Sequence, residues 1–82
     1  MKSLEQRVVA LLSRSAMIPE EAVALDSELE SLGMGSLEQI ECIMAIEEEL
    51  EVELPIADLR KLRTVSDVVQ AVRDAAADAG AR

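Results

Sequence analysis

The stretch that decides the fold is residues 32–50, which reads LGMGSLEQIECIMAIEEEL. Gly33 and Gly35 allow a sharp turn, and Ser36 followed three residues later by Gln39 is a capping-box pattern that predicts the start of a helix. Free N–H groups and the positive end of the helix dipole converge there, which favours a bound or covalently attached phosphate. A serine at a helix start is more often only an N-cap, so the functional interpretation of Ser36 depends on the helix that follows.

That helix has two different apolar faces. At about 100° per residue, one face is expected to be buried and consists of Cys42, Ile43, Ile46 and Leu50. The opposite face combines large apolar side chains with carboxylates: Leu37, Glu41, Met44 and Glu48. Such a face suits the docking of a partner protein, although single exposed Leu and Met side chains are also common on surfaces that bind nothing.

Two further helices are predicted from caps and periodicity. The first spans Leu4 to about Arg14 after Ser3, and the last spans Val65 to about Ala77 after Thr64, which is followed three residues later by an acidic residue. Both carry apolar side chains at helical spacing, and these are expected to form the core: Leu4, Val8, Leu11 and Leu12 in the first helix, and Val65, Val68, Val69 and Val72 in the last.

The remaining segments are predicted as loops and one short helix. Residues 15–35 form a long ordered loop that delivers Ser36, with a short turn from Pro19. The alternating residues 51–54 are assigned to a loop because no other segment offers a strand to pair with them, and residues 55–61 are predicted as a short helix. We therefore expect a single domain over residues 1–82, with 78–82 frayed, and an all-α fold of three main helices and one short helix.

The composition excludes several classes of function. The 82 residues include no Phe, Tyr, Trp or His and carry a net charge of −9, which argues against nucleic acid and anionic membranes as partners and favours basic protein surfaces. Between Ser15 and Leu59 lie 13 of the 17 acidic residues and no Lys or Arg. No segment has the features of a secretory leader or a membrane span, so we expect a cytoplasmic chain, and the high charge favours a monomer.

Catalysis by the chain itself is not expected. It lacks histidine, its one cysteine, Cys42, falls on the predicted core face, and the acidic middle has no lysine, so the usual general bases and nucleophiles are missing. Residues 26–37 resemble a calcium loop only in their acidity, because Ser31 and Leu37 replace the required glycine and glutamate. We predict neither catalytic residues nor a metal site.

The motifs together resemble the acyl carrier protein family, most closely its stand-alone bacterial fatty-acid type. The similarity covers roughly residues 25–72 and rests on Gly-x-x-Ser-Leu at 33–37, the run MAIEEEL at 44–50, Leu-Pro at 54–55 and Thr-Val at 64–65. It implies that Ser36 is the attachment point of 4'-phosphopantetheine, which a separate magnesium-dependent phosphopantetheinyl transferase takes from coenzyme A. Acyl groups would then be held as thioesters on the terminal thiol.

The resemblance also implies partners. Acyl-loading, condensing and acyl-transfer enzymes would dock through basic patches, and the matching positions in this chain are Leu37, Glu41, Met44, Glu47 and Glu48. By the same resemblance, an acyl-chain cavity would be bordered by Ile40, Ile43, Ala45 and Ile46.

Two departures from the family pattern favour a specialised pathway. Gly35 stands where the family usually has aspartate, and the region of the short third helix is basic at Arg60, Lys61 and Arg63. These changes suit a polyketide, a modified fatty acid or an aminoacyl cargo better than central fatty-acid synthesis. The alternative from another class is a non-enzymatic acidic helical adapter that binds a basic partner and in which Ser36 is only a cap.

Overall fold

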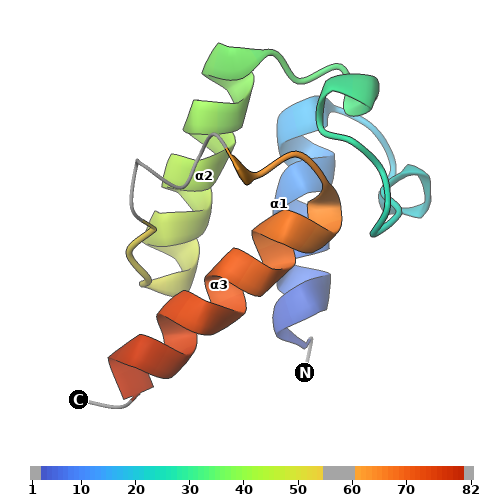
Figure 1. Ribbon diagram of the computed structural model, residues 1–82. Helices are drawn as coiled ribbons and strands as arrows, with labels where there is room; N and C mark the ends of the chain where they lie inside the picture. The colour runs from blue at the N-terminus through green and yellow to red at the C-terminus, as the bar shows by residue number, and fades with distance from the viewer. Residues whose placement is uncertain (1–2, 55–60, 81–82) are drawn as a thin grey trace.

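The described residues fold into three α-helices and two short 3₁₀ turns, and the predicted all-α fold is confirmed (Figure 1). The computed structural model describes residues 3–54 and 61–80. Its helices are α1 (Leu4–Ala16), α2 (Ser36–Leu50) and α3 (Val65–Gly80), with two 3₁₀ turns at Glu20–Ala22 and Glu30–Leu32. The predicted short helix at 55–61 falls almost entirely outside the described residues. No described helix is long and apolar enough to cross a membrane.

Local sequence signals set the starts of α1 and α3 as predicted. The Ser3 hydroxyl accepts a hydrogen bond from the backbone N–H of Gln6, whose side chain accepts one from Ser3 N–H in return. Thr64 and Asp67 form the same reciprocal pair at α3. The ends were predicted too early, because α1 continues two residues past Arg14 and α3 runs to Gly80, which includes residues expected to be frayed.

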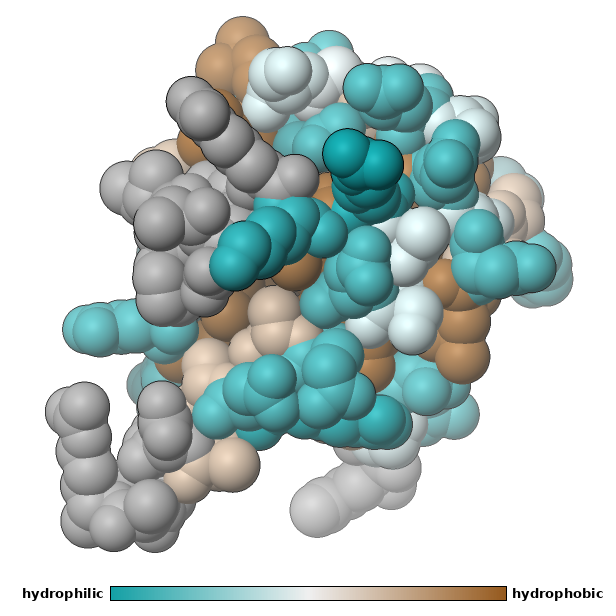
Figure 2. Space-filling view, in the orientation of Figure 1, coloured by the Kyte–Doolittle hydropathy of each residue, from teal (hydrophilic) through white to brown (hydrophobic). Residues whose placement is uncertain are grey.

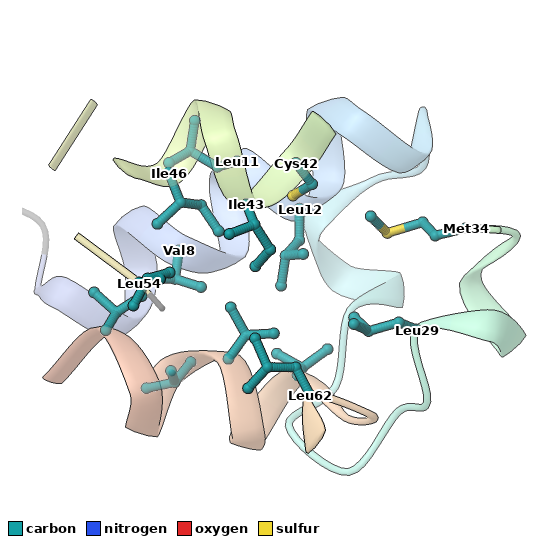
Figure 3. Packing of buried hydrophobic residues seen from close by; sticks show 14 of the residues in the cluster. Val8, Leu11, Leu12, Leu29, Met34, Cys42, Ile43, Ile46, Leu54 and Leu62 are labelled. Carbon is teal, nitrogen blue, oxygen red and sulfur yellow. The ribbon is translucent and has the colours of Figure 1, made fainter. Parts of the chain in front are cut away.

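The core is aliphatic and lies where the three helices meet (Figure 3). α1 packs against both α2 and α3. Most of the apolar positions predicted for α1 and α3 are buried, while Leu4 is only half-buried at the edge. The four valines of α3 are almost completely inaccessible: Val65, Val68, Val69 and Val72. Because no aromatic ring is available, β-branched side chains and leucines fill this interior.

The long connection between α1 and α2 is held against the start of α3. Leu29 N–H donates to the Arg63 carbonyl at 2.8 Å, Val65 N–H to Ser27 at 3.0 Å and Ser66 N–H to Leu25 at 2.8 Å. These bonds tie the connection to residues 63–66, which lie more than thirty residues further along the chain, and the periodicity of the sequence does not predict them. Val23 and Leu29 anchor the connection in the core, whereas Leu25 is 43% exposed.

Candidate functional site

Ser36 is the first residue of α2, as the start of the helix was predicted, but the prediction that the Ser36 side chain caps the helix is wrong. Gly35 is the N-cap residue, no side chain caps the helix, and the first helical bond runs from Gln39 N–H to the Gly35 carbonyl at 2.9 Å. The backbone N–H groups of Ser36, Leu37 and Glu38 therefore have no partner within the helix. Ser36 is exposed, and its hydroxyl has no hydrogen-bond partner among the described residues.

Neighbouring residues hold Ser36 in place. Met34 is 1% exposed and its N–H donates to the Leu29 carbonyl at 3.2 Å, while Gly33 adopts the left-handed φ of 86° that the preceding turn requires. Gln39, expected to complete a capping box with Ser36, instead donates from its side-chain amide to the Met34 carbonyl at 2.9 Å. The chain is thus anchored two residues before Ser36, the residue with which α2 begins. In Figure 1 the start of α2 is the green end of this helix.

The outer face of α2 is exposed as predicted. Leu37 is 66% and Met44 61% exposed, and the carboxylates of Glu41 and Glu48 are exposed on the same side. Ile40, which sequence reasoning placed beside an acyl cavity, is 44% exposed and extends this apolar strip. In Figure 2 hydrophilic side chains dominate the face in view and apolar atoms lie between them in separate groups.

Glu47 differs from the other predicted docking residues. It is half-buried, and its Oε2 accepts a hydrogen bond from Leu54 N–H at 2.9 Å. This bond holds residues 51–54 against α2, so that Val52 and Leu54 reach the core. The segment is a loop, as predicted, and the alternation in its sequence reflects burial of every second side chain against helices.

The groups required for catalysis are not assembled in the described part of the chain. Cys42 is 2% exposed, and burial raises the pKa of its thiol, so the sulfur stays protonated and unreactive at neutral pH. No group of metal-binding side chains occurs among the described residues. A groove between α1 and α2 is lined by side chains that include Arg14, Ala45 and Glu49, and it is wide open to solvent.

Comparison with known proteins identifies the family. Residues 6–72 match the family described as phosphopantetheine attachment site. Over 63 aligned residues the chain is 43% identical to the acyl carrier protein of Campylobacter jejuni subsp. doylei. The alignment covers 76% of this chain and 82% of that relative. The chain belongs to the acyl carrier protein family. Acyl carrier proteins are defined by a covalently attached 4'-phosphopantetheine and act as carriers for acyl-handling enzymes rather than as catalysts.

The geometry at the start of α2 fits this prosthetic group. A serine ester of phosphopantetheine contains a phosphodiester, and unpartnered N–H groups at a helix N-terminus are suitable donors for its oxygens. An acyl carrier protein also needs its hydroxyl accessible to a second protein, and Ser36 meets this condition. The sequence predicted that Ser36 caps the helix and missed that Gly35 is the N-cap residue and leaves the helix without a side-chain cap; the absence of a side chain at position 35 was the available signal.

Proposed function

We propose that Ser36 carries 4'-phosphopantetheine and that the protein holds acyl intermediates as thioesters for fatty-acid, polyketide or related biosynthesis. The observation that carries this proposal is the exposed, unpartnered Ser36 hydroxyl at the uncapped N-terminus of α2. Modification joins Ser36 Oγ to the phosphorus nearer the pantetheine of coenzyme A, adenosine 3',5'-bisphosphate leaves, and the hydroxyl proton passes to a base of the transferase. When bound, the group supplies a thiol for thioester formation.

We infer that partner enzymes dock on the outer face of α2. Leu37 and Met44 offer apolar contact, and Glu41 and Glu48 offer charges for basic patches on a phosphopantetheinyl transferase and on acyl-loading, condensing and acyl-transfer enzymes. Glu47 borders this face, and we infer that it contacts partner enzymes through Oε1, the carboxylate oxygen that does not accept the hydrogen bond from Leu54 N–H. We expect a monomer, because the strong negative charge opposes self-association.

The pathway we favour is a specialised one. Gly35 removes a carboxylate beside the modified hydroxyl, and Lys61 and Arg63 make the region before α3 basic. Different charges around the serine imply a different set of partners from those of the central fatty-acid carrier, so a polyketide, a modified fatty acid or an aminoacyl group is the proposed cargo.

Intact-mass measurement tests the attachment. The purified chain, incubated with coenzyme A, magnesium and a broad-specificity phosphopantetheinyl transferase, should gain one phosphopantetheine, and Ser36→Ala should gain none. Because the hydroxyl has no partner among the described residues, Ser36→Ala should change the free energy of unfolding by no more than about 0.5 kcal/mol. The mutant is therefore a folded control.

Absence of a mass increase, under conditions that modify a known carrier, would favour the acidic adapter instead. In that case binding of a basic partner would survive Ser36→Ala and would be weakened by Glu41→Lys or Met44→Ala. For either function, docking through exposed carboxylates should weaken as salt is added, because exposed charges are screened.

A further inference from the structure

The groove between α1 and α2 is built from one turn of each helix. Each wall is a set of three residues at positions i, i+3 and i+4, which share one face of a helix. The residues are Leu11, Arg14 and Ser15 on α1, and Ala45, Glu48 and Glu49 on α2. The groove has a volume of about 580 Å³. Ser15 and Ala45 keep it open, because longer side chains at these positions would fill the space between the helices.

The charged side chains of the groove do not neutralise one another. Within residues 3–54 and 61–80, the exposed side chain of Arg14 makes no ion pair or hydrogen bond, and neither do the exposed side chains of Glu48 and Glu49. The positions three and four residues from Arg14 hold only apolar side chains, so α1 itself offers it no carboxylate. One wall is therefore cationic and the other anionic, and both are available to another molecule.

This arrangement selects the chemistry of an occupant. A segment that is basic throughout would be repelled by Arg14, and one that is acidic throughout would be repelled by Glu48 and Glu49. The ridge of a third helix fits between two packed helices. An amphipathic helix with acidic side chains on one flank, basic side chains on the other and apolar residues between them matches both walls, and its apolar residues would contact Leu11 and Ala45.

We propose that the groove is a second docking site, which receives such a helix from a partner enzyme. The inference rests on the proposed docking of partner enzymes on the outer face of α2. Glu48 belongs to both surfaces, so one partner reaches both without a gap. Arg14 supplies selectivity, because it favours partners that present a carboxylate over partners whose contact surface is basic throughout.

Two synthetic peptides test the chemistry of the site. The first is a helix of about 18 residues with Leu along one face, Lys on one flank and Glu on the other, and in the second Gln replaces every Glu. In titrations of the ¹⁵N-labelled chain followed by NMR, the Glu peptide should bind about two- to fivefold more tightly. General attraction to a chain of net charge −9 predicts the opposite order, because the Gln peptide is the more positive. The amide shift changes should concentrate at residues 11–15 and 45–49.

Three variants separate the roles of charge and space. Arg14→Gln should reverse the preference, so that the Gln peptide binds more tightly. The matched control is Arg73→Gln, which removes one exposed positive charge from α3, outside the groove, and should keep the wild-type preference. Ala45→Leu leaves every charge in place but fills the groove, and it should weaken binding of both peptides. Thermal unfolding followed by circular dichroism confirms that the variants are folded.

Four results would overturn the inference. They are tighter binding of the Gln peptide to the wild type, an unchanged preference in Arg14→Gln, wild-type binding of both peptides by folded Ala45→Leu, and shift changes that lie outside the groove. Peptide binding does not require a modified Ser36. A chain that binds the Glu peptide as expected but accepts no phosphopantetheine would therefore refute the proposed attachment alone, so the two failures are distinguishable.

Discussion

Ser36 owes its position to the residues around it and not to bonds of its own. Met34 anchors the chain in the core, Gln39 holds the Met34 carbonyl, and Gly35 leaves the helix start open. This arrangement suits a serine that must enter the active site of another protein, because its hydroxyl does not first have to break a hydrogen bond within its own chain.

Met17 is the clearest case of local strain. It ends α1 with φ 59°, a left-handed conformation that favours glycine, and its side chain is 90% exposed. Met17→Gly should therefore raise the free energy of unfolding by about 0.5 kcal/mol, because it relieves the strain and loses no buried contact. Urea unfolding monitored by circular dichroism measures the change.

The control for this prediction is Met17→Ala. Alanine removes the same exposed side chain but keeps a Cβ in the left-handed conformation, so it should give no gain. Equal stabilisation by alanine and glycine would show that the methionine side chain, and not the backbone, is responsible.

The start of α3 depends on a charged cap. Asp67 accepts hydrogen bonds from the backbone N–H groups of Thr64 and Arg63, both at 3.1 Å, and these bonds lower the pKa of its carboxyl below the usual value. A carboxyl whose pKa is lower in the folded protein stabilises the fold at pH values above its unfolded pKa of about 3.9. This contribution is lost as the pH falls through the lowered, folded-state pKa.

Asp67→Asn should therefore cost stability at neutral pH, and this cost should shrink as the pH falls below the unfolded-state pKa of about 3.9 and then through the lowered folded-state pKa. Urea unfolding of both proteins at a series of pH values gives the difference in free energy of unfolding. A difference that stays constant from neutral to acid pH would show that the charge of Asp67 does not support the cap.

The segment that follows α2 depends on one side chain. Glu47→Ala removes the acceptor for the half-buried Leu54 N–H and should lower the free energy of unfolding by about 1–2 kcal/mol. Glu47→Gln keeps an oxygen acceptor and should cost less, and Glu48→Ala, on the exposed face, is the matched control. Equal losses for Glu47→Ala and Glu48→Ala in urea unfolding would contradict a role for this hydrogen bond.

The whole molecule combines a small aliphatic core with strong negative charge. The net charge is −9, and 13 of the 17 acidic residues lie between Ser15 and Leu59, a stretch that contains no Lys or Arg. Such self-repulsion destabilises a compact state, but it also keeps the molecule soluble and directs it towards basic partners. Stability and docking therefore depend on salt in opposite directions.

Raising ionic strength from about 0.01 M to about 0.15 M should increase Tm by a few degrees, because the Debye length falls from about 30 Å to about 8 Å. Thermal unfolding followed by circular dichroism measures it. A double variant, Glu48→Gln with Glu49→Gln, carries less charge and should show a smaller increase. A wild-type Tm that is unchanged or lower in salt would rule out repulsion as a limit on stability.

Features set by neighbours in sequence were predicted correctly. The caps of α1 and α3, the valine stripe of α3, the exposed face of α2 and the burial of Cys42 follow from periodicity and from residues three or four positions apart, which a helix necessarily brings together. The family motif around Ser36 is likewise local. The amino-acid sequence alone was therefore enough to predict the fold class and to propose the candidate serine.

Other features require the folded chain. Ser36 and Gln39 fit a capping box by spacing, but the anchoring of Met34 shifts the cap to Gly35 and frees the hydroxyl. The pairing of residues 25–29 with 63–66 and the bond from Leu54 to Glu47 depend on which surfaces meet when the helices pack. Each residue type determines which hydrogen-bond donors and acceptors a position has. Which of these groups bond to one another depends on their proximity in space, and the packing of the core sets that proximity.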